Sequence, residues 1–385
     1  MNIPRKPDPP VPARERAILV CLEIGKRGEP DRAEEAASLT EAAGGQVCEV
    51  VTGRRDRPDA ATFAGSGKVE ELKGICRLHD ARTVVFDHDL TAAQVRNLER
   101  ALSEGGPEVR IYDRTDLILE IFAQRARSHE GKLQVELARL EHLSTRLVRG
   151  WTHLERQRGG LSKTGGPGEK QIELDRRLIG ERVKKVKERL KKVGRVRATQ
   201  RAARTRSGML RVSIVGYTNA GKSTLFNRLT RADSFVADQL FATLDPTTRR
   251  LHLGEGVNAA ISDTVGFVRN LPHGLVAAFR STLEETVQAD LLLHVVDASN
   301  PRHDEQIDAV NVVLAEIGAA DIPQIVVWNK IDRIPGAQPE VVRDPCGKIL
   351  NIKASAVSGA GLEAIRAALA DVARETDPRA LAPAA

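Results

Sequence analysis

Residues 216–223 read GYTNAGKS and directly follow a strand-like apolar run at 212–215. This string has the form of a phosphate-binding loop between a buried strand and a helix. In such a loop the glycines let backbone N–H groups curl around a β-phosphate, Lys222 reaches the β- and γ-phosphate oxygens, and the Ser223 hydroxyl ligates Mg²⁺. The predicted nucleotide-binding residues here are Gly216, Tyr217, Thr218, Asn219, Ala220, Gly221, Lys222, Ser223 and Thr224.

A second string indicates which base is bound. Asn329, Lys330 and Asp332 form an NKxD pattern after an apolar strand at 325–328, and this looks like the guanine-specifying motif of GTPases. A carboxylate accepts hydrogen bonds from guanine N1–H and the exocyclic amine, and a base lacking both donors would cost about 1 to 3 kcal/mol. We expect Asn329 to contact the base edge and tie down the loop, and the Lys330 stem to pack along the ring. An isolated NKxD is also compatible with a simple polar turn.

Two more strings fall in the order that a GTPase requires. DTVG at 263–266 resembles the second switch, in which Asp263 holds Mg²⁺ through water and the Gly266 N–H meets the γ-phosphate. Ser355 and Ala356 resemble the final loop, whose alanine N–H touches guanine O6. We therefore add these four residues to the predicted nucleotide site.

The first switch lies at FATLDP, residues 241–246. Thr243 is the expected Mg²⁺ ligand in the GTP state, with Thr247 and Thr248 as alternatives that the sequence leaves open. The predicted catalytic residues are Lys222, Thr243 and Gly266.

Phe267 stands where Ras-like GTPases place the glutamine that orients the attacking water. An aromatic ring can neither accept a proton nor orient a water molecule, so intrinsic hydrolysis should be slow. Asn219 resembles the potassium-ligating asparagine of some GTPases, and K⁺ beside the phosphates would neutralise charge in the transition state. The alternative is that Asn219 only tolerates the turn geometry of the loop.

Composition places the chain among globular proteins. Its 385 residues are 41% hydrophobic and 29% charged, which suffices for two or three domains. There is no run of 18 or more apolar residues, and the proline-rich, charged start resembles no signal peptide, so no membrane span and a cytoplasmic location are expected. The four cysteines show no metal-ligand spacing and fit free, buried thiols.

The net charge of +7 is unevenly distributed. Residues 123–211 contain about 25 Lys and Arg against about 9 Asp and Glu, roughly +16, which leaves roughly −9 for the rest. Such a concentration suggests a polyanionic partner, although a solvated helix with i,i+4 ion pairs would have the same composition.

Apolar residues in this basic stretch recur at helical spacing, from Leu133 to Leu154 and from Ile179 to Val193. Ten residues at 159–168, rich in glycine, separate the two series and cannot be helical. We therefore predict an antiparallel helical hairpin with a glycine-rich tip, and not a simple linker, which would need no apolar seam. The residues expected to contact folded RNA at this tip are Arg156, Arg158, Lys163 and Lys170.

The first 120 or so residues alternate strand-like and helix-like segments, which predicts a small, mainly parallel sheet. Residues 65–68, GSGK, resemble a fragment of a second phosphate-binding loop but lack its first glycine and its Mg²⁺ hydroxyl. We interpret them as a helix start and not as an ATPase site.

The chain as a whole resembles the HflX family of ribosome-associated GTPases. The specific strings are TFAGSGKVEEL at 62–72, DHDLTAAQVRNLE at 87–99, RGWTHLERQRGG at 149–160 and GGPGEKQIELDRR at 165–177, together with FATLDPT and DTVGF. The resemblance implies binding to the large ribosomal subunit and its RNA, ribosome-stimulated GTP hydrolysis, and a role in splitting or rescuing stalled ribosomes. Lys170 replaces a threonine usual in the family, and the sequence stops soon after 362–373, without the extra C-terminal domain of some members.

The expected fold class is α/β: an N-terminal α/β domain, a long antiparallel helical hairpin, and a P-loop GTPase domain with a doubly wound, mainly parallel sheet. The expected bounds are a flexible tail at 1–16, the α/β domain at 17–128, the hairpin at 129–207, the GTPase domain at 208–375 and a tail at 376–385. The expected protein is a monomer that uses GTP, GDP, Mg²⁺ and, as a hypothesis, K⁺. Two other functions stay open, a GTP-gated ribosome-assembly chaperone and a nucleotide-gated protein adaptor.

Overall fold

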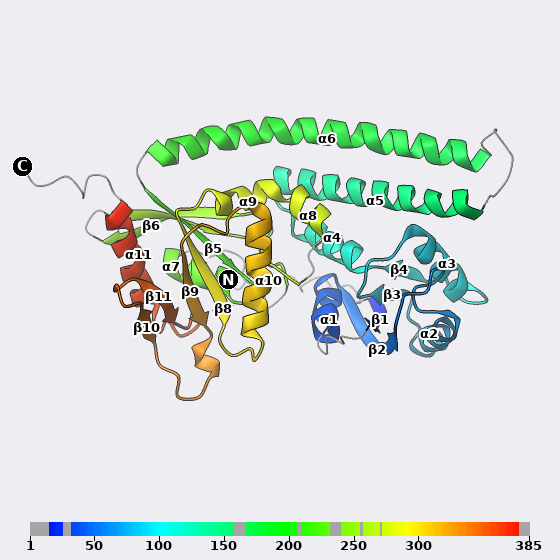
Figure 1. Ribbon diagram of the computed structural model, residues 1–385, viewed down its shortest axis with the longest axis horizontal. Helices are drawn as coiled ribbons and strands as arrows, with labels where there is room; N and C mark the ends of the chain where they lie inside the picture. The colour runs from blue at the N-terminus through cyan, green and yellow to red at the C-terminus, as the bar shows by residue number, and fades with distance from the viewer. Residues whose placement is uncertain are drawn as a thin grey trace, which may run out of the picture. The chain divides into compact units, whose positions relative to one another are not determined.

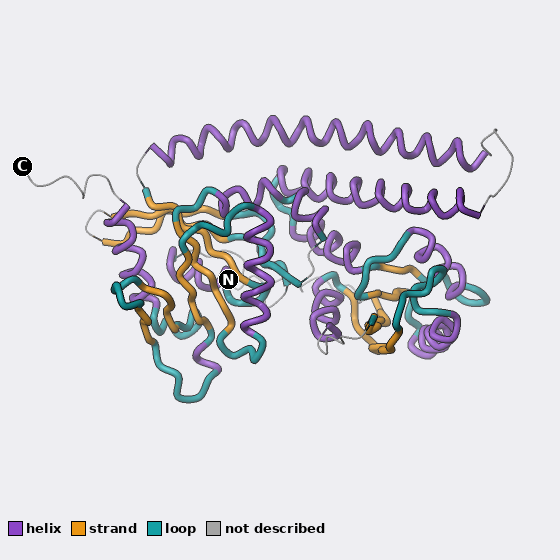
Figure 2. Tube along the Cα trace, in the orientation of Figure 1, coloured by secondary structure: helices purple, strands orange, loops and turns teal. Residues whose placement is uncertain are grey.

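The computed structural model describes residues 15–25, 32–157, 167–206, 209–231, 240–254, 257–269 and 272–376. The chain divides into two compact units, one of Met1–Ile121 with Val148–Gly159, the other of Phe122–Leu147 with Gly160–Ala385. Helices and strands are traced in Figures 1 and 2. Residues 1–14, 158–166 and 377–385 lie outside the described residues, and they include most of the two predicted tails and of the predicted tip at 159–168. The tail predicted at 1–16 was wrong at Glu15 and Arg16, which begin strand β1 (Glu15–Ile24).

The first unit contains a four-stranded parallel sheet in the order β2-β1-β3-β4. Its strands are β1 (Glu15–Ile24), β2 (Gly45–Arg55), β3 (Thr83–Phe86) and β4 (Arg110–Tyr112), and its helices are α1 (Arg32–Ala42), α2 (Ser66–His79), α3 (Ala92–Ser103) and the start of α4 (Arg114–Arg125). Residues 17–22 of β1 are all buried, as expected for a central strand of a parallel sheet covered on both faces. The α/β prediction for this part of the chain is confirmed.

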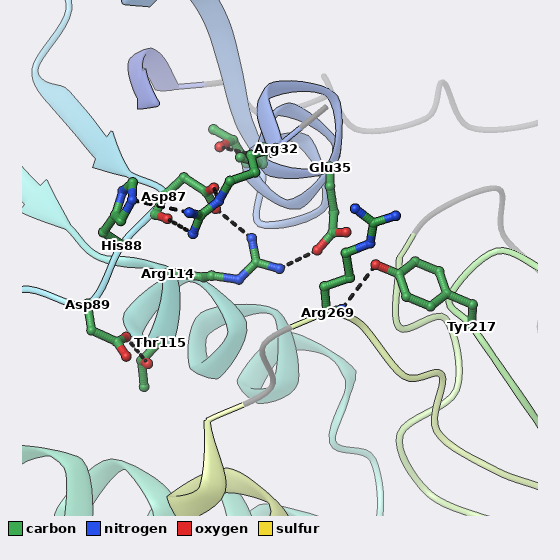
Figure 3. A network of polar contacts seen from close by, with 11 residues as sticks. Arg32, Glu35, Asp87, His88, Asp89, Arg114, Thr115, Tyr217 and Arg269 are labelled. Atoms are coloured by element: carbon green, nitrogen blue, oxygen red, sulfur yellow. Dashed lines mark hydrogen bonds and ion pairs between the residues drawn. The ribbon is translucent and has the colours of Figure 1, made fainter. Parts of the chain in front are cut away.

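Charged side chains meet at the carboxyl end of β3 (Figure 3). The buried Asp87 carboxylate accepts hydrogen bonds from Arg114 at 2.5 Å and from Arg32 at 3.0 Å, and Arg114 also pairs with Glu35. Burial, together with the charges of Arg32 and Arg114, lowers the pKa of the adjacent His88 to about 4. Buried charges persist only when paired, so this network ties α1 and α4 to the sheet.

The residues GSGK at 65–68 begin helix α2, as expected. Gly65 precedes the helix with φ 83°, and the Lys68 ammonium donates to the carbonyl of Thr52 at 3.0 Å and pairs with Glu71 at 2.8 Å. The Lys68 ammonium therefore binds oxygens of Thr52 and Glu71 within the same unit.

Two long helices, α5 (His129–Gln157) and α6 (Pro167–Arg206), form the predicted helical pair. In the second unit Leu133 and Leu137 of α5 pack with Val186 of α6 in one apolar cluster, flanked by ion pairs from Arg182 to Glu136 and from Lys187 to Glu141, each 2.8 Å long. The prediction that residues 159–168 are not helical was wrong for the last two residues. Pro167 and Gly168 belong to the first turn of α6, because proline is favoured at the first helical position, where its missing N–H is not needed.

The second unit also contains a seven-stranded sheet in the order β10-β11-β9-β8-β5-β7-β6. The strands are β5 (Leu210–Gly216), β6 (Thr247–Gly254), β7 (Val257–Asp263), β8 (Leu291–Asp297), β9 (Gln324–Asn329), β10 (Glu340–Arg343) and β11 (Ile349–Lys353). Only the two edge strands, β6 and β10, run antiparallel to their neighbours. The predicted mainly parallel sheet is confirmed.

Helices cover this sheet on both faces (Figure 1). They are α7 (Lys222–Thr230), α9 (Arg280–Val287), α10 (His303–Ile317) and α11 (Leu362–Thr376). The short helix α8 (His273–Ala278) contacts α9, and a 3₁₀ turn spans Ile331–Arg333. Val212 and Ile214 of β5 share a core with α7 and α11, whereas α9 and α10 contact β5 without joining that core. Alternate residues of β5 therefore face the two helical layers, as a doubly wound sheet requires.

Among the described residues no helix is both long enough and apolar enough to cross a bilayer. The four cysteines are free, and burial raises the pKa of Cys21 to about 12 and of Cys76 to about 11. Cys346 is exposed and Cys48 half-buried, so the expectation of buried thiols was wrong for these two.

Candidate nucleotide site

The loop between β5 and α7 has the conformation that its glycines allow. Gly216 has φ 147°, and a Cβ there would lie 2.2 Å from the backbone oxygen of Val295 in β8. Any side chain at 216 would push the loop off the neighbouring strand, so only glycine fits. A pocket opens over this loop and is lined by Thr218, Asn219, Gly221, Lys222, Ser223, Thr224, Phe241, Ala242, Thr243, Thr264 and Gly266.

Lys222, the first residue of α7, has its ammonium group buried beneath the loop. It donates to the carbonyl oxygen of Tyr217 at 2.7 Å. Burial lowers the pKa of Lys222 to about 8, the charge of Asp263 opposes that shift, and the charge of Lys330 adds to it. A buried cation with so little compensation is well suited to bind a polyphosphate.

The three residues predicted to hold Mg²⁺ lie together. Ser223 Oγ donates to Asp263 Oδ2 at 2.7 Å, Thr243 Oγ1 donates to the same oxygen at 2.9 Å, and the two hydroxyls are 2.8 Å apart. Thr247 and Thr248 instead lie in β6, where the Thr248 hydroxyl contacts that of Ser262 at 2.8 Å. Of the three threonines considered, the structure brings Thr243 to this cluster.

The cluster fits a hard divalent cation. Asp263 Oδ1 is a buried carboxylate oxygen with no hydrogen-bond partner among the described residues, and burial raises the pKa of Asp263. Hydroxyl and carboxylate oxygens are the ligands that Mg²⁺ prefers, either directly or through water. A cation here would compensate the unpaired carboxylate oxygen, which supports Ser223, Thr243 and Asp263 as the residues that would hold it.

Gly266 closes the pocket opposite Lys222. A Cβ at 266 would lie 2.9 Å from Lys222 Nζ and 3.0 Å from the Cα of Thr218, so the backbone passes very near the loop. The following residue, Phe267, is fully buried, and its carbonyl accepts from the Thr218 N–H at 2.8 Å. The ring is therefore part of the core and does not face a bound nucleotide.

The base-reading strings also meet. The Asn329 side chain donates to the carbonyl of Ala220 at 2.9 Å and accepts from the Ala356 N–H at 2.9 Å, so it ties the phosphate loop to the final loop. The backbone N–H of Ala356, which was expected to contact guanine O6, donates to Asn329 in this structure. Ser355 donates its hydroxyl to Asp332, the predicted base-reading carboxylate.

Lys330 is joined to a residue that the sequence reading missed. Its ammonium lies 2.8 Å from Asp297 at the end of β8. Burial opposes ionisation of Asp297, but hydrogen bonds from Lys330 and Ser299 hold the pKa of that carboxyl below its usual value. The DAS string after an apolar strand, 297–299, was the available signal.

Another contact absent from the sequence reading links the phosphate loop to the second switch. The Tyr217 hydroxyl accepts a hydrogen bond from the Arg269 N–H at 3.0 Å (Figure 3), and the Arg269 guanidinium pairs with Glu305 of α10. Arg269, three residues after Gly266, is therefore held by its backbone N–H to the phosphate loop and by its side chain to α10.

The structure does not decide the roles of the remaining predicted residues, Asn219 and the four RNA-contact residues. Asn219 is exposed at the pocket with φ 59°, a left-handed conformation that asparagine tolerates, so both readings of this residue stay open. Arg156 and Lys170 lie on the described backbone of α5 and α6, but their side chains are outside the described set, and Arg158 and Lys163 lie outside the described residues. The RNA-contact prediction stays a prediction.

Family models match the chain in three consecutive segments. Residues 30–123 match a model described as the GTP-binding GTPase N-terminal region, residues 125–204 match the GTP-binding GTPase middle region, and residues 211–330 match a 50S ribosome-binding GTPase. Together the segments span most of the chain.

Relatives match over similar lengths. GTPase HflX of Escherichia coli K12 is 50% identical over 359 residues, covering 93% of this chain and 83% of that protein. GTPase HflX of Caldanaerobacter subterraneus subsp. tengcongensis is 46% identical over 356 residues, covering 92% and 80%. The crystal structure of SsGBP in complex with GDP covers 94% of this chain and 99% of that one, at 24% identity and a TM-score of 0.50, and this supports the fold alone.

Proposed function

The chain belongs to the HflX family of GTPases, and from that premise we propose that this GTP-binding and GTP-hydrolysing enzyme acts on the large ribosomal subunit in ribosome splitting, rescue or recycling. The observation that carries the ribosomal part is the match of residues 211–330 to a model described as a 50S ribosome-binding GTPase. Ribosomes are cytoplasmic, so the proposal implies that location.

The pocket residues divide the chemistry among them. Lys222 neutralises the β- and γ-phosphates, and Asp332 accepts the two guanine donors that select the base. Ser223, Thr243 and Asp263 would hold Mg²⁺, which would neutralise phosphate charge when bound. Gly266 brings its N–H to the γ-phosphate, a contact that any side chain at 266 would block.

Intrinsic hydrolysis is slow on this account, because Phe267 occupies the position at which Ras-like GTPases carry the glutamine that orients the attacking water. Phe267 is buried in the core, so its ring cannot take that part. A stimulating partner, with or without K⁺ at Asn219, must complete the site. We propose that the large subunit is this partner.

The basic helices supply the RNA-binding surface. On α6 the side chains of Lys184, Lys185, Lys191 and Lys192 are exposed, while Val186 and Leu190 face α5. The cations thus lie on the side of the seam that is open to solvent, where phosphate contacts give affinity without sequence specificity. The proposal also assigns RNA contacts to the tip residues Arg156, Arg158, Lys163 and Lys170.

The experiment that tests the proposal is co-sedimentation with purified large subunits in a non-hydrolysable GTP analogue, with salt raised from about 50 to about 200 mM. We expect binding that falls steeply with salt. Neutralising the four tip cations to glutamine should reduce binding strongly and leave GTP hydrolysis by the free protein unchanged.

The matched control removes the same charge elsewhere, as Arg96→Gln, Arg100→Gln, Arg343→Gln and Lys348→Gln, all exposed positions. This control should bind nearly as well as the unmodified protein. Equal losses in both variants would show that net charge, and not the tip, determines binding. Binding only to assembly precursors would favour the ribosome-assembly chaperone, and failure to bind any ribosomal particle would favour the protein adaptor.

A further inference from the structure

The first switch is anchored on both sides of Thr243. Two residues before it, Phe241 is 2% exposed and adopts φ 54°, a conformation that a phenylalanine takes only when its surroundings enforce it. Its ring packs edge-on against Phe122 at 4.8 Å between centroids, and Phe122 packs in turn on Phe279 at 4.7 Å. All three rings belong to the second unit.

Two residues after Thr243, the carboxylate of Asp245 binds the start of helix α5. Asp245 Oδ2 accepts from the N–H of Arg127 at 2.8 Å and of Ser128 at 2.7 Å, and Asp245 Oδ1 accepts from the Ser128 hydroxyl at 2.5 Å. A carboxylate is favoured at a helix N-terminus, where unsatisfied N–H groups and the helix dipole are both positive.

Ser128 connects this carboxylate to the helix itself. Its Oγ accepts from the Gly131 N–H at 2.8 Å, the usual contact of an N-cap serine, while the same hydroxyl donates to Asp245. Asp245, Ser128 and the first turn of α5 therefore form one hydrogen-bonded chain. Both carboxylate oxygens of Asp245 accept hydrogen bonds from Arg127 or Ser128.

Asp245, which binds α5, lies close in sequence to Thr243, which lies at the nucleotide pocket. Thr243 and Asp245 are two residues apart, so their Cα atoms are separated by at most about 7 Å. Thr243 Oγ1 contacts both Ser223 and Asp263 in the cluster that fits Mg²⁺. The anchor on α5 and the hydroxyl at the cluster are therefore separated by only two residues of backbone.

We propose that Asp245 is a positioning residue for GTP hydrolysis, which places Thr243 at the magnesium cluster by fastening the first switch to the N-terminus of α5. The inference rests on the proposed role of Thr243. Its consequence is that the helical pair and the nucleotide pocket are coupled, so a partner that moves α5 alters hydrolysis without touching the pocket.

The first test compares Asp245→Ala with Thr243→Ala. Because Thr243 is expected to hold Mg²⁺ only in the GTP state, Asp245→Ala should lower the affinity for a non-hydrolysable GTP analogue with Mg²⁺ by about tenfold or more, equivalent to about one or two hydrogen bonds. We expect kcat to fall by a similar factor. Affinity for GDP should stay within about twofold. A purely structural role would weaken both nucleotides together.

A second variant separates switch position from helix stability. A Cβ at Gly131 would lie 2.3 Å from Asp245 Oδ1, so Gly131→Ala must move the Asp245 carboxylate. Asp245 itself is not mutated in this variant. Alanine is the better helix former, so the same change favours α5 itself. The gain in helix propensity offsets part of the capping hydrogen bonds that the displaced carboxylate loses. The inference therefore predicts lower kcat and weaker GTP-analogue binding with little change in Tm.

Gly180→Ala is the matched control, since a Cβ at this exposed position of α6 has open space around it. It should leave kcat and both affinities unchanged. The inference is overturned if Thr243→Ala loses hydrolysis while Asp245→Ala and Gly131→Ala keep it. If Thr243→Ala also keeps full hydrolysis, the assignment of Thr243 in the proposed function fails instead.

Discussion

Asn329→Ala offers a strong quantitative test of the site, because one buried side chain joins two loops. The amide of Asn329 is 2% exposed and makes one hydrogen bond to the Ala220 carbonyl and one from the Ala356 N–H. Truncation leaves both backbone groups without this partner, at about 1 to 3 kcal/mol each. The expected loss of unfolding free energy is therefore about 2 to 6 kcal/mol, and the expected fall in Tm is about 2 to 4 °C per kcal/mol.

Nucleotide affinity should fall in the same variant, and equally for GTP and GDP, because the two loops flank the base and the β-phosphate. Thermal unfolding and titration with both nucleotides measure these effects. Asn97→Ala is the matched control, since it removes a single solvent-exposed hydrogen bond, from Asn97 to the Ala61 carbonyl. The reasoning is refuted if Asn329→Ala is no less stable than Asn97→Ala, or if it weakens GTP alone.

Three further predictions concern single residues. Lys222→Ala should abolish hydrolysis, and unchanged GTP turnover would remove Lys222 from the site. Asp332→Asn should shift preference from guanine toward xanthine nucleotides in competition binding; retained selectivity would contradict the base-reading assignment. Burial lowers the pKa of His294 to about 4, so the unfolded chain binds the extra proton below about pH 6.5, and stability should fall from there to about pH 4 by up to about 1.4 kcal/mol per pH unit. His294→Gln should reduce that slope in denaturant titrations, while His88, whose pKa is also about 4, keeps its own contribution. An identical slope would exclude His294 as a source.

Local strings predicted most of the fold and the nucleotide pocket. Glycine spacing, strand-like runs and the NKxD pattern are properties of short segments, and their physical reasons lie within a few residues of each motif. Gly216 illustrates this, since its positive φ follows from the chemistry of the phosphate-binding loop. The parallel sheet of the first unit followed from the alternation of strand-like and helix-like segments in the first 120 or so residues.

Contacts between distant segments were not predictable in this way. The pairing of Lys330 with Asp297 and the capping of α5 by Asp245 join residues 33 and 117 positions apart. No local pattern distinguishes these acids from solvated ones. The choice among Thr243, Thr247 and Thr248 needed the register of β6 against β7, and the start of α6 at Pro167 was mistaken for loop because glycines surround it.

The most direct test of the central proposal is the GTPase rate of the purified protein in potassium buffer, alone and with large subunits, small subunits or joined ribosomes. The proposal predicts a low rate alone that rises many-fold with every particle containing the large subunit and is unchanged by small subunits. A rate that no ribosomal particle increases would contradict it.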